Sequence, residues 1–288
     1  MNPALMHVTS RRFGSLVALV GILGTAACEH TKENSSLSTT VMQERRAEAG
    51  QHPAHEALAL IFDRKLLVQT GPAQWHLRAP SLGEKGMCRR SAFQSQPHTS
   101  GCTGVLIRPQ VLVTTSSCAR RQACSDMGIV FGFDLDSVAS DPKMPSAQQI
   151  ARCQRVDERP NGLSLVWLQG APQTKVTPAQ IAATAAPTAG QTTEVDVLSH
   201  PAGIPAKWTR TTLRPPFGAL GQAAQIDASP SEVSDGAAVF APHSSVLVGI
   251  VRTDDEAVIN GEGCGAWHDC TRPPCRQTVL QDFGLDER

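Results

Sequence analysis

Short apolar runs recur along the chain between turn signals, and they have the length of strands. The clearest pair is formed by residues 104–107 and 111–114, which flank the turn Arg108-Pro109-Gln110. Similar runs occupy residues 128–133, 163–168, 194–198 and 245–251. β-branched segments of this length, separated by Pro and Gly and with little helical periodicity, predict an all-β barrel or sandwich.

The N-terminal residues have the pattern of an export signal. Two arginines precede the apolar run 13–23, which is short and interrupted by glycine, so it suits the core of a signal peptide better than a membrane span. The small residues directly before Cys28 resemble a bacterial lipobox, in which this cysteine is lipidated. Thr25 stands where leucine is usual, so ordinary cleavage near Ala27 stays open. We predict a signal peptide over residues 1–27, of the lipoprotein type.

A polar segment separates this signal from the folded part. Residues 28–56 are rich in Ser, Thr, Glu, Gln and Arg and have almost nothing to bury, so they predict a disordered tether. The folded domain is expected over residues 57–288. Within it, the Ala- and Thr-rich stretch 172–191 is interpreted as a long surface connection.

Composition narrows the range of partners. The 288 residues contain 26 Lys and Arg against 26 Asp and Glu, so no electrostatic footprint points to nucleic acid or an anionic membrane surface. Tyrosine is absent and aromatic residues make up 4%, which weighs against a platform that stacks bases or sugars. The core must therefore be built mainly from Val, Leu, Ile and Ala.

The cysteines fit an oxidising compartment. Without Cys28 the chain has an even set of eight, which predicts disulfide bonds in an exported protein. A zinc cluster of Cys264, His268, Cys270 and Cys275 is the alternative, but the spacing matches no common Cys-His pattern. We therefore expect disulfides, with no metal and no cofactor.

Five segments carry motifs that occur together, in this order, in one family. They are the strand pair 102–118, the segment from Cys124 through 130–133 to Cys153, the strand 163–168, the His-Pro turn within 198–207, and residues 235–240 with the Val-Gly-Ile strand behind them. Together they resemble the trypsin-like serine proteases, closest to the bacterial glutamyl-endopeptidase-like branch, from about Cys88 to Cys275. The resemblance implies a double β-barrel preceded by the signal peptide and the polar tether.

The resemblance also implies two disulfide bonds. The family has a bridge beside its active site, which corresponds to Cys102 with Cys118, and a second pair, which corresponds to Cys124 with Cys153. For the remaining four cysteines, which no motif pairs, we expect Cys88 with Cys270 and Cys264 with Cys275.

Carried over position by position, the catalytic triad is missing. Ser117 stands at the position of the general base, Gly162 or its neighbour Asn161 at that of the orienting carboxylate, and Asp235 at that of the nucleophile. Trypsin-like chemistry needs a hydroxyl, an imidazole and a carboxylate there, and neither Ser nor Gly titrates near neutrality. Val233 replaces the glycine whose N–H helps to form the oxyanion hole, and an ionised Asp235 would repel the oxyanion.

Three residues offer ways to rescue catalysis. Ser234 is one residue from the expected nucleophile, but a shift of one residue in extended chain turns the side chain to the opposite face. His200 matches the non-catalytic His-Pro turn of the family. Asp235 as an acid catalyst or nucleophile would need a second carboxylate, and the sequence does not choose among Asp157, Glu232 and Asp227.

The sequence therefore predicts an exported, catalytically inactive trypsin-like homologue. We expect a monomer in the bacterial cell envelope, attached through a lipid on Cys28, or else a secreted protein. Its cleft between the barrels would hold a peptide or protein partner without cutting it. The alternative is an active hydrolase that uses Ser234 or Asp235. A decaying paralogue is a third hypothesis, and the eight retained cysteines speak against it.

Overall fold

The computed structural model describes most of the predicted folded domain. The described residues are 52–89, 91, 93–135, 145–170, 176–182, 192–215, 223–229, 231–253, 258–260, 264–267, 276–281 and 283. Several predicted features lie outside the described residues: the predicted signal peptide with Cys28, the predicted tether up to residue 51, most of the stretch 172–191, and His268, Cys270 and Cys275.

Six antiparallel strands form the first barrel. They are β1 (Leu58–Asp63), β4 (Cys102–Arg108), β5 (Val111–Thr115), β6 (Met127–Phe131), β7 (Ile150–Glu158) and β8 (Leu163–Leu168). The barrel closes in the order β1-β4-β5-β8-β7-β6, because β1 pairs with both β4 and β6. Most residues of β1, β4, β5, β6 and β8 are buried, so one face fills the barrel while the other packs against neighbouring elements.

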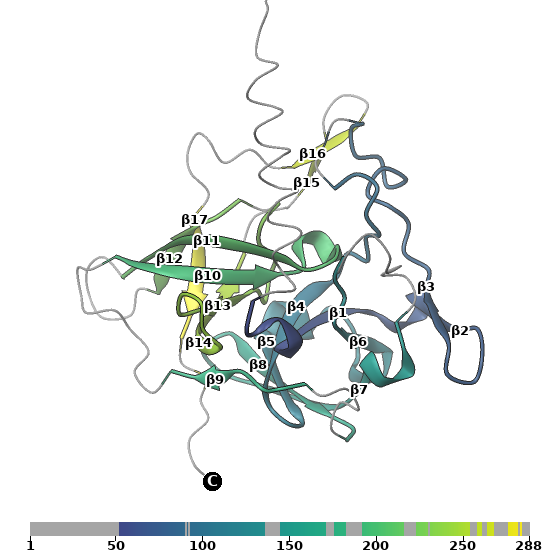
Figure 1. The fold of residues 1–288 in the computed structure, drawn as a ribbon, viewed down its shortest axis with the longest axis horizontal. Coiled ribbons are helices and arrows are strands. Elements are labelled where there is room, and N and C mark those ends of the chain that lie inside the picture. The colour runs from purple at the N-terminus through teal and green to yellow at the C-terminus, as the bar shows by residue number, and fades with distance from the viewer. Residues whose placement is uncertain are drawn as a thin grey trace, which may run out of the picture.

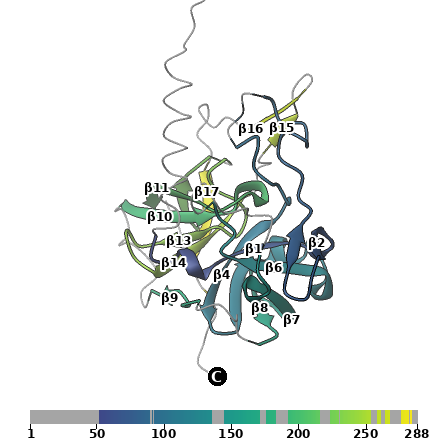
Figure 2. The same ribbon diagram turned by 45° about the vertical axis from the view of Figure 1, so that its right-hand side comes forward.

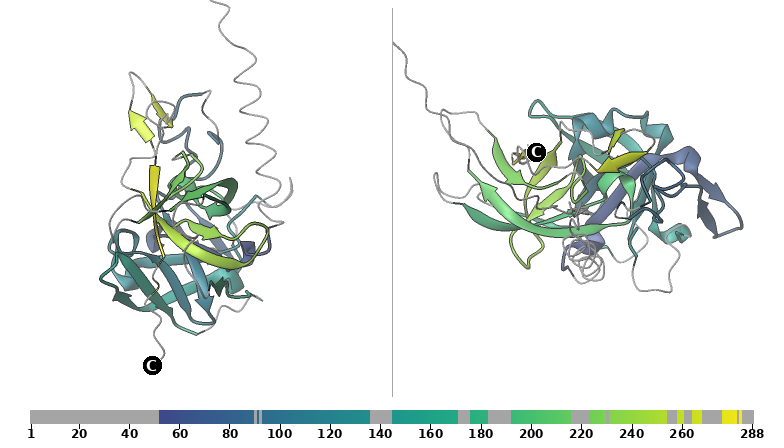
Figure 3. Two further views of the ribbon diagram at one scale, coloured as in Figure 1. Left: turned by 90° about the vertical axis from the view of Figure 1, so that its left-hand side faces the viewer. Right: turned by 90° about the horizontal axis from the view of Figure 1, so that it is seen from above.

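A second set of six strands closes in the same way. They are β10 (Thr193–Ser199), β11 (Lys207–Arg214), β12 (Ala224–Asp227), β13 (Ala238–Phe240), β14 (Val246–Arg252) and β17 (Arg276–Leu280). The order β13-β10-β11-β12-β17-β14 becomes a ring because β13 also pairs with β14. Its core consists of Val, Leu, Ile and Ala side chains, as the composition predicted. The two barrels lie side by side, the first blue to teal and the second green to yellow (Figure 1 and, from above, Figure 3).

The remaining elements are short. The strands are β2 (Leu67–Gln69), β3 (Trp75–Leu77), β9 (Gln180–Ile181), β15 (Val258–Asn260) and β16 (Gly265–Trp267). The helical turns are η2 (His55–Ala57), η3 (Arg64–Leu66), α2 (Ser116–Ala119), η4 (Cys124–Asp126), η5 (Ala147–Gln149) and η6 (Pro201–Gly203). The predicted all-β double β-barrel is confirmed. No helix among the described residues has the length and hydrophobicity to span a membrane.

Folded structure begins before the predicted boundary at residue 57. His52 and Ala54 are buried, with 7% and 3% of their surface exposed. The His52 ring lies 3.4 Å from the Asp196 carboxylate on β10, and His55 pairs with Asp134, which follows β6. We call residues 52–57 the N-terminal arm. The sequence prediction placed residues 52–56 in the tether, because polar histidines give no sign that buried carboxylates will pair with them.

Three disulfides lie in the described part. Cys102 with Cys118 joins β4 to α2, and Cys124 with Cys153 joins η4 to β7, as the resemblance implied. The third joins Cys88 to Cys264, so the expected pairs of Cys88 with Cys270 and of Cys264 with Cys275 are wrong.

Backbone pairing explains this third bridge. The N–H of Cys88 donates to the carbonyl of Gly265 at 2.8 Å, and the N–H of Gly265 donates to the carbonyl of Gly86 at 2.8 Å. This brings the Cα atoms of Cys88 and Cys264 to 5.0 Å. Figure 2 shows the β15–β16 hairpin beside the blue segment that carries Cys88. The bridge also removes Cys264 from the zinc cluster considered above, since a disulfide sulfur offers no thiolate.

Candidate functional site

The residues predicted to replace the triad meet where the two barrels touch. Ser117 lies in α2 directly after β5, Gly162 lies in the turn between β7 and β8, and Asp235 lies in the loop before β13. Backbone contact joins the two barrels here, because the N–H of Thr103 on β4 donates to the carbonyl of Asp235 at 3.0 Å. The site is therefore built by both barrels.

The carboxylate of Asp235 is enclosed by hydroxyl groups. The Oγ of Ser117 donates to its Oδ2 at 2.5 Å, and the Oγ1 of Thr115 donates to the same oxygen at 2.8 Å. The backbone N–H of Thr253 lies 3.4 Å from Oδ1. Only 4% of Asp235 is exposed, so hydrogen bonds stabilise a carboxylate that is nearly removed from water.

Gly236 fixes the direction of Asp235. Its φ is 84°, in the left-handed region, and a Cβ placed there would lie 1.9 Å from the carbonyl oxygen of Thr103. Its N–H donates to the carbonyl of Val251 at 2.9 Å. Only glycine fits this close approach between the loop and β4.

Gly162 leaves space that an arginine approaches. Its φ is 86°, and a Cβ built there would lie 3.9 Å from Nη1 of Arg252, at the end of β14. The carbonyl of Gly162 accepts a hydrogen bond from the N–H of Ser116 at 2.7 Å. The side chain of the neighbouring Asn161 accepts from the N–H of Leu163 at 3.2 Å, so it stabilises the turn. Neither position supplies a carboxylate.

The N–H at the oxyanion-hole position is directed into its own loop. Val233 N–H donates to the carbonyl of Ser229 at 3.0 Å, and Glu232 N–H donates to the same carbonyl at 2.9 Å. The side chain of Val233 is 1% exposed and packs in the core of the second barrel with Ala237. Hydrogen bonding and packing therefore both keep this N–H away from the cleft.

Ser234 is buried in a hydroxyl network and has no base. Its Oγ lies 2.8 Å from Thr103 Oγ1 and 3.4 Å from Ser199 Oγ, and 8% of the residue is exposed. His200 is adjacent, but its Nδ1 lies 3.1 Å from the carbonyl of Ile204. Burial lowers the pKa of His200 to about 3, so the ring is neutral at physiological pH.

Histidines and carboxylates elsewhere give Asp235 no partner for catalysis. Asp157 accepts from Trp167 Nε1 at 2.6 Å, Asp227 pairs with Arg214, and Glu232 caps its own loop at Ser229. Within the described ranges, no histidine ring is hydrogen-bonded to Ser117, Ser234 or Asp235. In the same ranges, no three His, Cys, Asp or Glu side chains are arranged to hold a metal ion.

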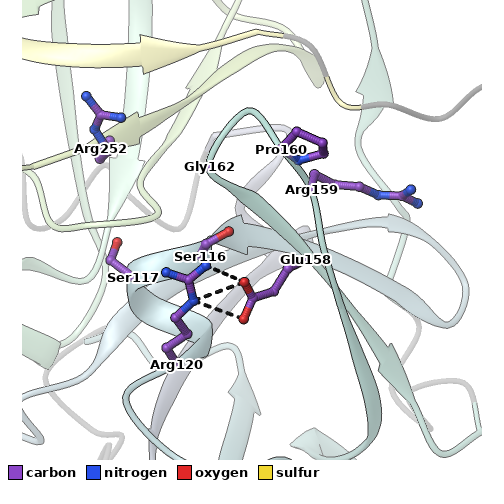
Figure 4. Close-up of a pocket in the computed structure, with 8 residues that line it drawn as sticks. All are labelled: Ser116, Ser117, Arg120, Glu158, Arg159, Pro160, Gly162 and Arg252. Carbon is purple, nitrogen blue, oxygen red and sulfur yellow. Dashed lines mark hydrogen bonds and ion pairs between the residues drawn. The ribbon is translucent and has the colours of Figure 1, made fainter.

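A pocket of about 520 Å³ opens beside Ser117 (Figure 4). It is lined by Ser116, Ser117, Arg120, Glu158, Arg159, Pro160, Gly162 and Arg252. The Nε of Arg120 donates to both carboxylate oxygens of Glu158, at 2.9 and 3.0 Å. This hydrogen-bonded pair raises the pKa of Arg120 and lowers that of Glu158. Sequence reasoning found none of the four charged residues, because single charges at strand ends carry no motif.

Comparisons with known proteins give structural likeness alone. No family model and no curated protein matches the sequence. Among solved structures, the Rv3671c protease from M. tuberculosis in its active form is 12% identical, covers 81% of each chain and has a TM-score of 0.46. Kallikrein-related peptidase 10 in complex with Zn2+ is 13% identical over 80% of this chain and 92% of that chain, with a TM-score of 0.45. Human heparin binding protein is 11% identical over 79% and 86%, with a TM-score of 0.45. At such low identities and scores, these likenesses carry nothing about the family, activity or ligands of this chain.

Proposed function

We propose that this chain is a catalytically inactive trypsin-like protein whose cleft between the barrels binds a peptide or protein segment. The contact between Ser117 and Asp235 carries the proposal. In an active triad the base position takes a proton from the nucleophile position. Here the base position holds the hydroxyl of Ser117, which donates to Asp235. The nucleophile position holds the Asp235 carboxylate, which accepts that hydrogen bond.

The surroundings of Asp235 support the loss of acyl-transfer chemistry. A carboxylate at the nucleophile position is unsuited to the negative charge that develops in the transition state. The N–H of Val233, which would stabilise that charge, is bonded to Ser229. Removing one oxyanion-hole donor from a protease costs about 2.7–4 kcal/mol in transition-state stabilisation. The Asp235 carboxylate and the occupied Val233 N–H therefore both disfavour the transition state of acyl transfer.

A hydrolase that uses Ser234 or Asp235 is the alternative. Both residues are less than a tenth exposed, and the neighbouring neutral His200 faces the carbonyl of Ile204. Ser234 would need an imidazole within about 3 Å to become a nucleophile. Binding without cleavage is therefore favoured.

Export is part of the proposal. The predicted signal peptide and Cys28 support a lipid-anchored protein of the bacterial cell envelope, or a secreted one, acting as a monomer. Three disulfides in the described part are typical of proteins that leave the cytosol.

Reaction with a fluorophosphonate probe and turnover of a peptide ester test the absence of catalysis. We expect no labelling and no turnover above those of Ser234→Ala. Labelling that disappears in Ser234→Ala would contradict the proposal and support the hydrolase.

Selection from a random peptide library tests binding. Peptides enriched on the wild-type protein are expected to lose affinity for Ser117→Trp, in which an indole fills the pocket, after folding is confirmed by thermal melting. Peptides that bind both proteins equally, or no enrichment at all, would contradict a binding cleft at this place.

A further inference from the structure

We propose that Asn161 is a modification site, at which the side-chain amide is converted to aspartate and isoaspartate through a succinimide. The proposal goes beyond the binding function and does not depend on what the pocket holds. Asn161 directly precedes Gly162 in the turn between β7 and β8. Glycine has no Cβ to shield its nitrogen, so this nitrogen can attack the side-chain carbonyl of the asparagine before it.

The turn holds the Asn161 side chain against its own backbone. Its Oδ1 accepts a hydrogen bond from the N–H of Leu163, two residues further on, at 3.2 Å. This contact closes a ring of the size of a β-turn, in which the side-chain carbonyl takes the place of a backbone carbonyl. The Cγ atom is therefore folded back toward the Gly162 nitrogen, and this is the approach that ring closure to a succinimide needs.

Backbone hydrogen bonds fix the conformation of this turn. The N–H of Arg159 donates to the carbonyl of Leu163 at 2.8 Å, and the N–H of Ser116 donates to the carbonyl of Gly162 at 2.7 Å. Gly162 itself has a φ of 86°, which residues with a side chain rarely adopt. Because the peptide between Asn161 and Gly162 is held in place, less conformational entropy is lost when the two reacting atoms meet.

The reaction needs water and hydroxide alone. Hydroxide removes the proton of the Gly162 N–H, whose hydrogen bond to the carbonyl of Arg159 is long, at 3.2 Å. The nitrogen then forms a bond to Cγ of Asn161, and the Leu163 N–H stabilises the charge that develops on Oδ1. The bond from Cγ to Nδ2 breaks, and the amide nitrogen leaves as ammonia with a proton from water. Water then opens the succinimide at one of its two carbonyls, which gives aspartate or isoaspartate.

A second asparagine before glycine gives a comparison within the same chain. Asn260 precedes Gly261 and ends β15, where it is paired with Gly265 of β16. Ring closure requires the backbone after the asparagine to rotate, and strand pairing opposes this rotation because the hydrogen-bonded ladder would break. We therefore expect Asn161 to react first, although both asparagines have the same following residue.

The modification changes the pocket beside Ser117. Asn161 lies between Pro160 and Gly162, which both line this pocket (Figure 4). Aspartate adds a negative charge to the turn, whereas isoaspartate adds the charge and also lengthens the backbone by one methylene. We expect the longer turn to displace the Gly162 carbonyl and so to weaken its hydrogen bond with the Ser116 N–H. An aged chain would then present a different pocket from a newly made one.

Peptide mapping by mass spectrometry during incubation in mildly alkaline buffer tests the proposal. A chain that begins after Cys28 is sampled over time, folded and in denaturant, and an isoaspartate-specific carboxyl methyltransferase distinguishes isoaspartate from aspartate. In the folded chain we expect Asn161 to convert at least about tenfold faster than Asn260. In denaturant the two rates should agree within about threefold, because neither turn nor strand then positions the reacting atoms.

Two variants serve as controls. Asn161→Gln keeps an amide on a longer side chain and should stay unmodified, which assigns the site. Asn161→Asp carries the charge without the additional methylene, so its melting temperature should stay above that of wild-type protein enriched in isoaspartate. A melting temperature as low as that of the aged protein would contradict the expected effect of the lengthened backbone.

The rates decide the proposal itself. It is overturned if Asn161 stays intact in the folded chain while the denatured chain is converted, or if Asn260 converts as fast as Asn161 in the folded chain. The same tenfold ratio in denaturant would also overturn it, because the neighbouring sequence and not the turn would then set the rate. None of these outcomes bears on labelling by fluorophosphonate, which tests the proposed function separately.

Discussion

Rebuilding the triad should fail unless the oxyanion hole is rebuilt too. The starting variant combines Ser117→His, Gly162→Asp, Asp235→Ser and Arg252→Ser. The last change is needed because a carboxylate at position 162 would otherwise pair with Arg252, whose Nη1 lies 3.9 Å from the Cβ position. We expect turnover of a peptide ester to stay near background, because the N–H of Val233 remains bonded to Ser229.

Adding Val233→Gly should then raise kcat/KM by about a hundred- to a thousand-fold. That is the effect of one oxyanion-hole donor, about 2.7–4 kcal/mol in the transition state. Glycine permits the positive φ that turns this N–H toward the cleft. The change also empties a core site that is 1% exposed, so we expect a stability loss of about 2–4 kcal/mol.

Steady-state kinetics on both variants decide the outcome, with folding confirmed at the assay temperature. High activity in the starting variant would show that the Val233 N–H is not the obstacle. No gain from Val233→Gly in a folded protein would show that the cleft has been remodelled beyond the oxyanion hole. A gain much larger than a thousand-fold would mean that the substitution moves more of the loop than one N–H.

Four further outcomes follow from the structure. A chain that begins after Cys28 should show no free thiols in a denaturing titration without reductant. Two or more reactive thiols would contradict the predicted pairing of all eight cysteines. The double variant Cys88→Ser and Cys264→Ser should lower the free energy of unfolding by about 2–4 kcal/mol. Gly236→Ala should fail to accumulate as folded protein, since its Cβ would lie 1.9 Å from the carbonyl of Thr103, and a normal melting temperature would refute that packing. Asp196→Ala should lower the free energy of unfolding by about 3 kcal/mol, because it leaves Arg210 and His52 without their carboxylate. Chemical denaturation measures this loss. A loss below about 1 kcal/mol would mean that these two pairs with Asp196 do not stabilise the fold. The free energy of unfolding should fall as the pH drops from about 6.5 toward 3, because His200 binds a proton in the unfolded chain but stays neutral in the folded one. The melting temperature of His200→Gln should decrease less over that range.

The fold could be predicted from sequence where strands are buried on both faces. β4, β5 and β8 appear as mostly apolar runs, and the turns after β4 and before β8 carry Pro or Gly. The sequence pattern misses β7 and β11 because polar residues interrupt their apolar pattern. The residues of β7 are half-buried or exposed, and those of β11 are buried or half-buried. Pairing with already buried neighbours stabilises these strands, and no local pattern reports it.

The site was predictable only in part. The order of the motifs assigned Ser117 and Asp235 to two of the triad positions, but it could not predict the hydrogen bond between them. The sequence predicted that Val233 disfavours the backbone conformation of an oxyanion hole. The structure adds the hydrogen bond from the Val233 N–H to the carbonyl of Ser229, which directs this N–H away from the cleft. The third disulfide could not be predicted from the sequence, because four cysteines allow three pairings. The choice among them depends on the backbone contact between Cys88 and Gly265. Arg252 reaches Gly162 only once both barrels have closed.

The N-terminal arm would be the first described part of the chain to bear a pull applied before residue 52. Its two histidines fasten residues 52–57 to both barrels, through Asp196 on β10 and Asp134 after β6. A force that pulls on the chain before residue 52 therefore meets these two pairs before it reaches β1, which is itself held by strands on both sides. Tension would then be shared between the barrels, and β1 would not be the first element to be pulled away. A protein held at its N-terminus would in this way keep the pocket beside Ser117 intact while its partner pulls on it.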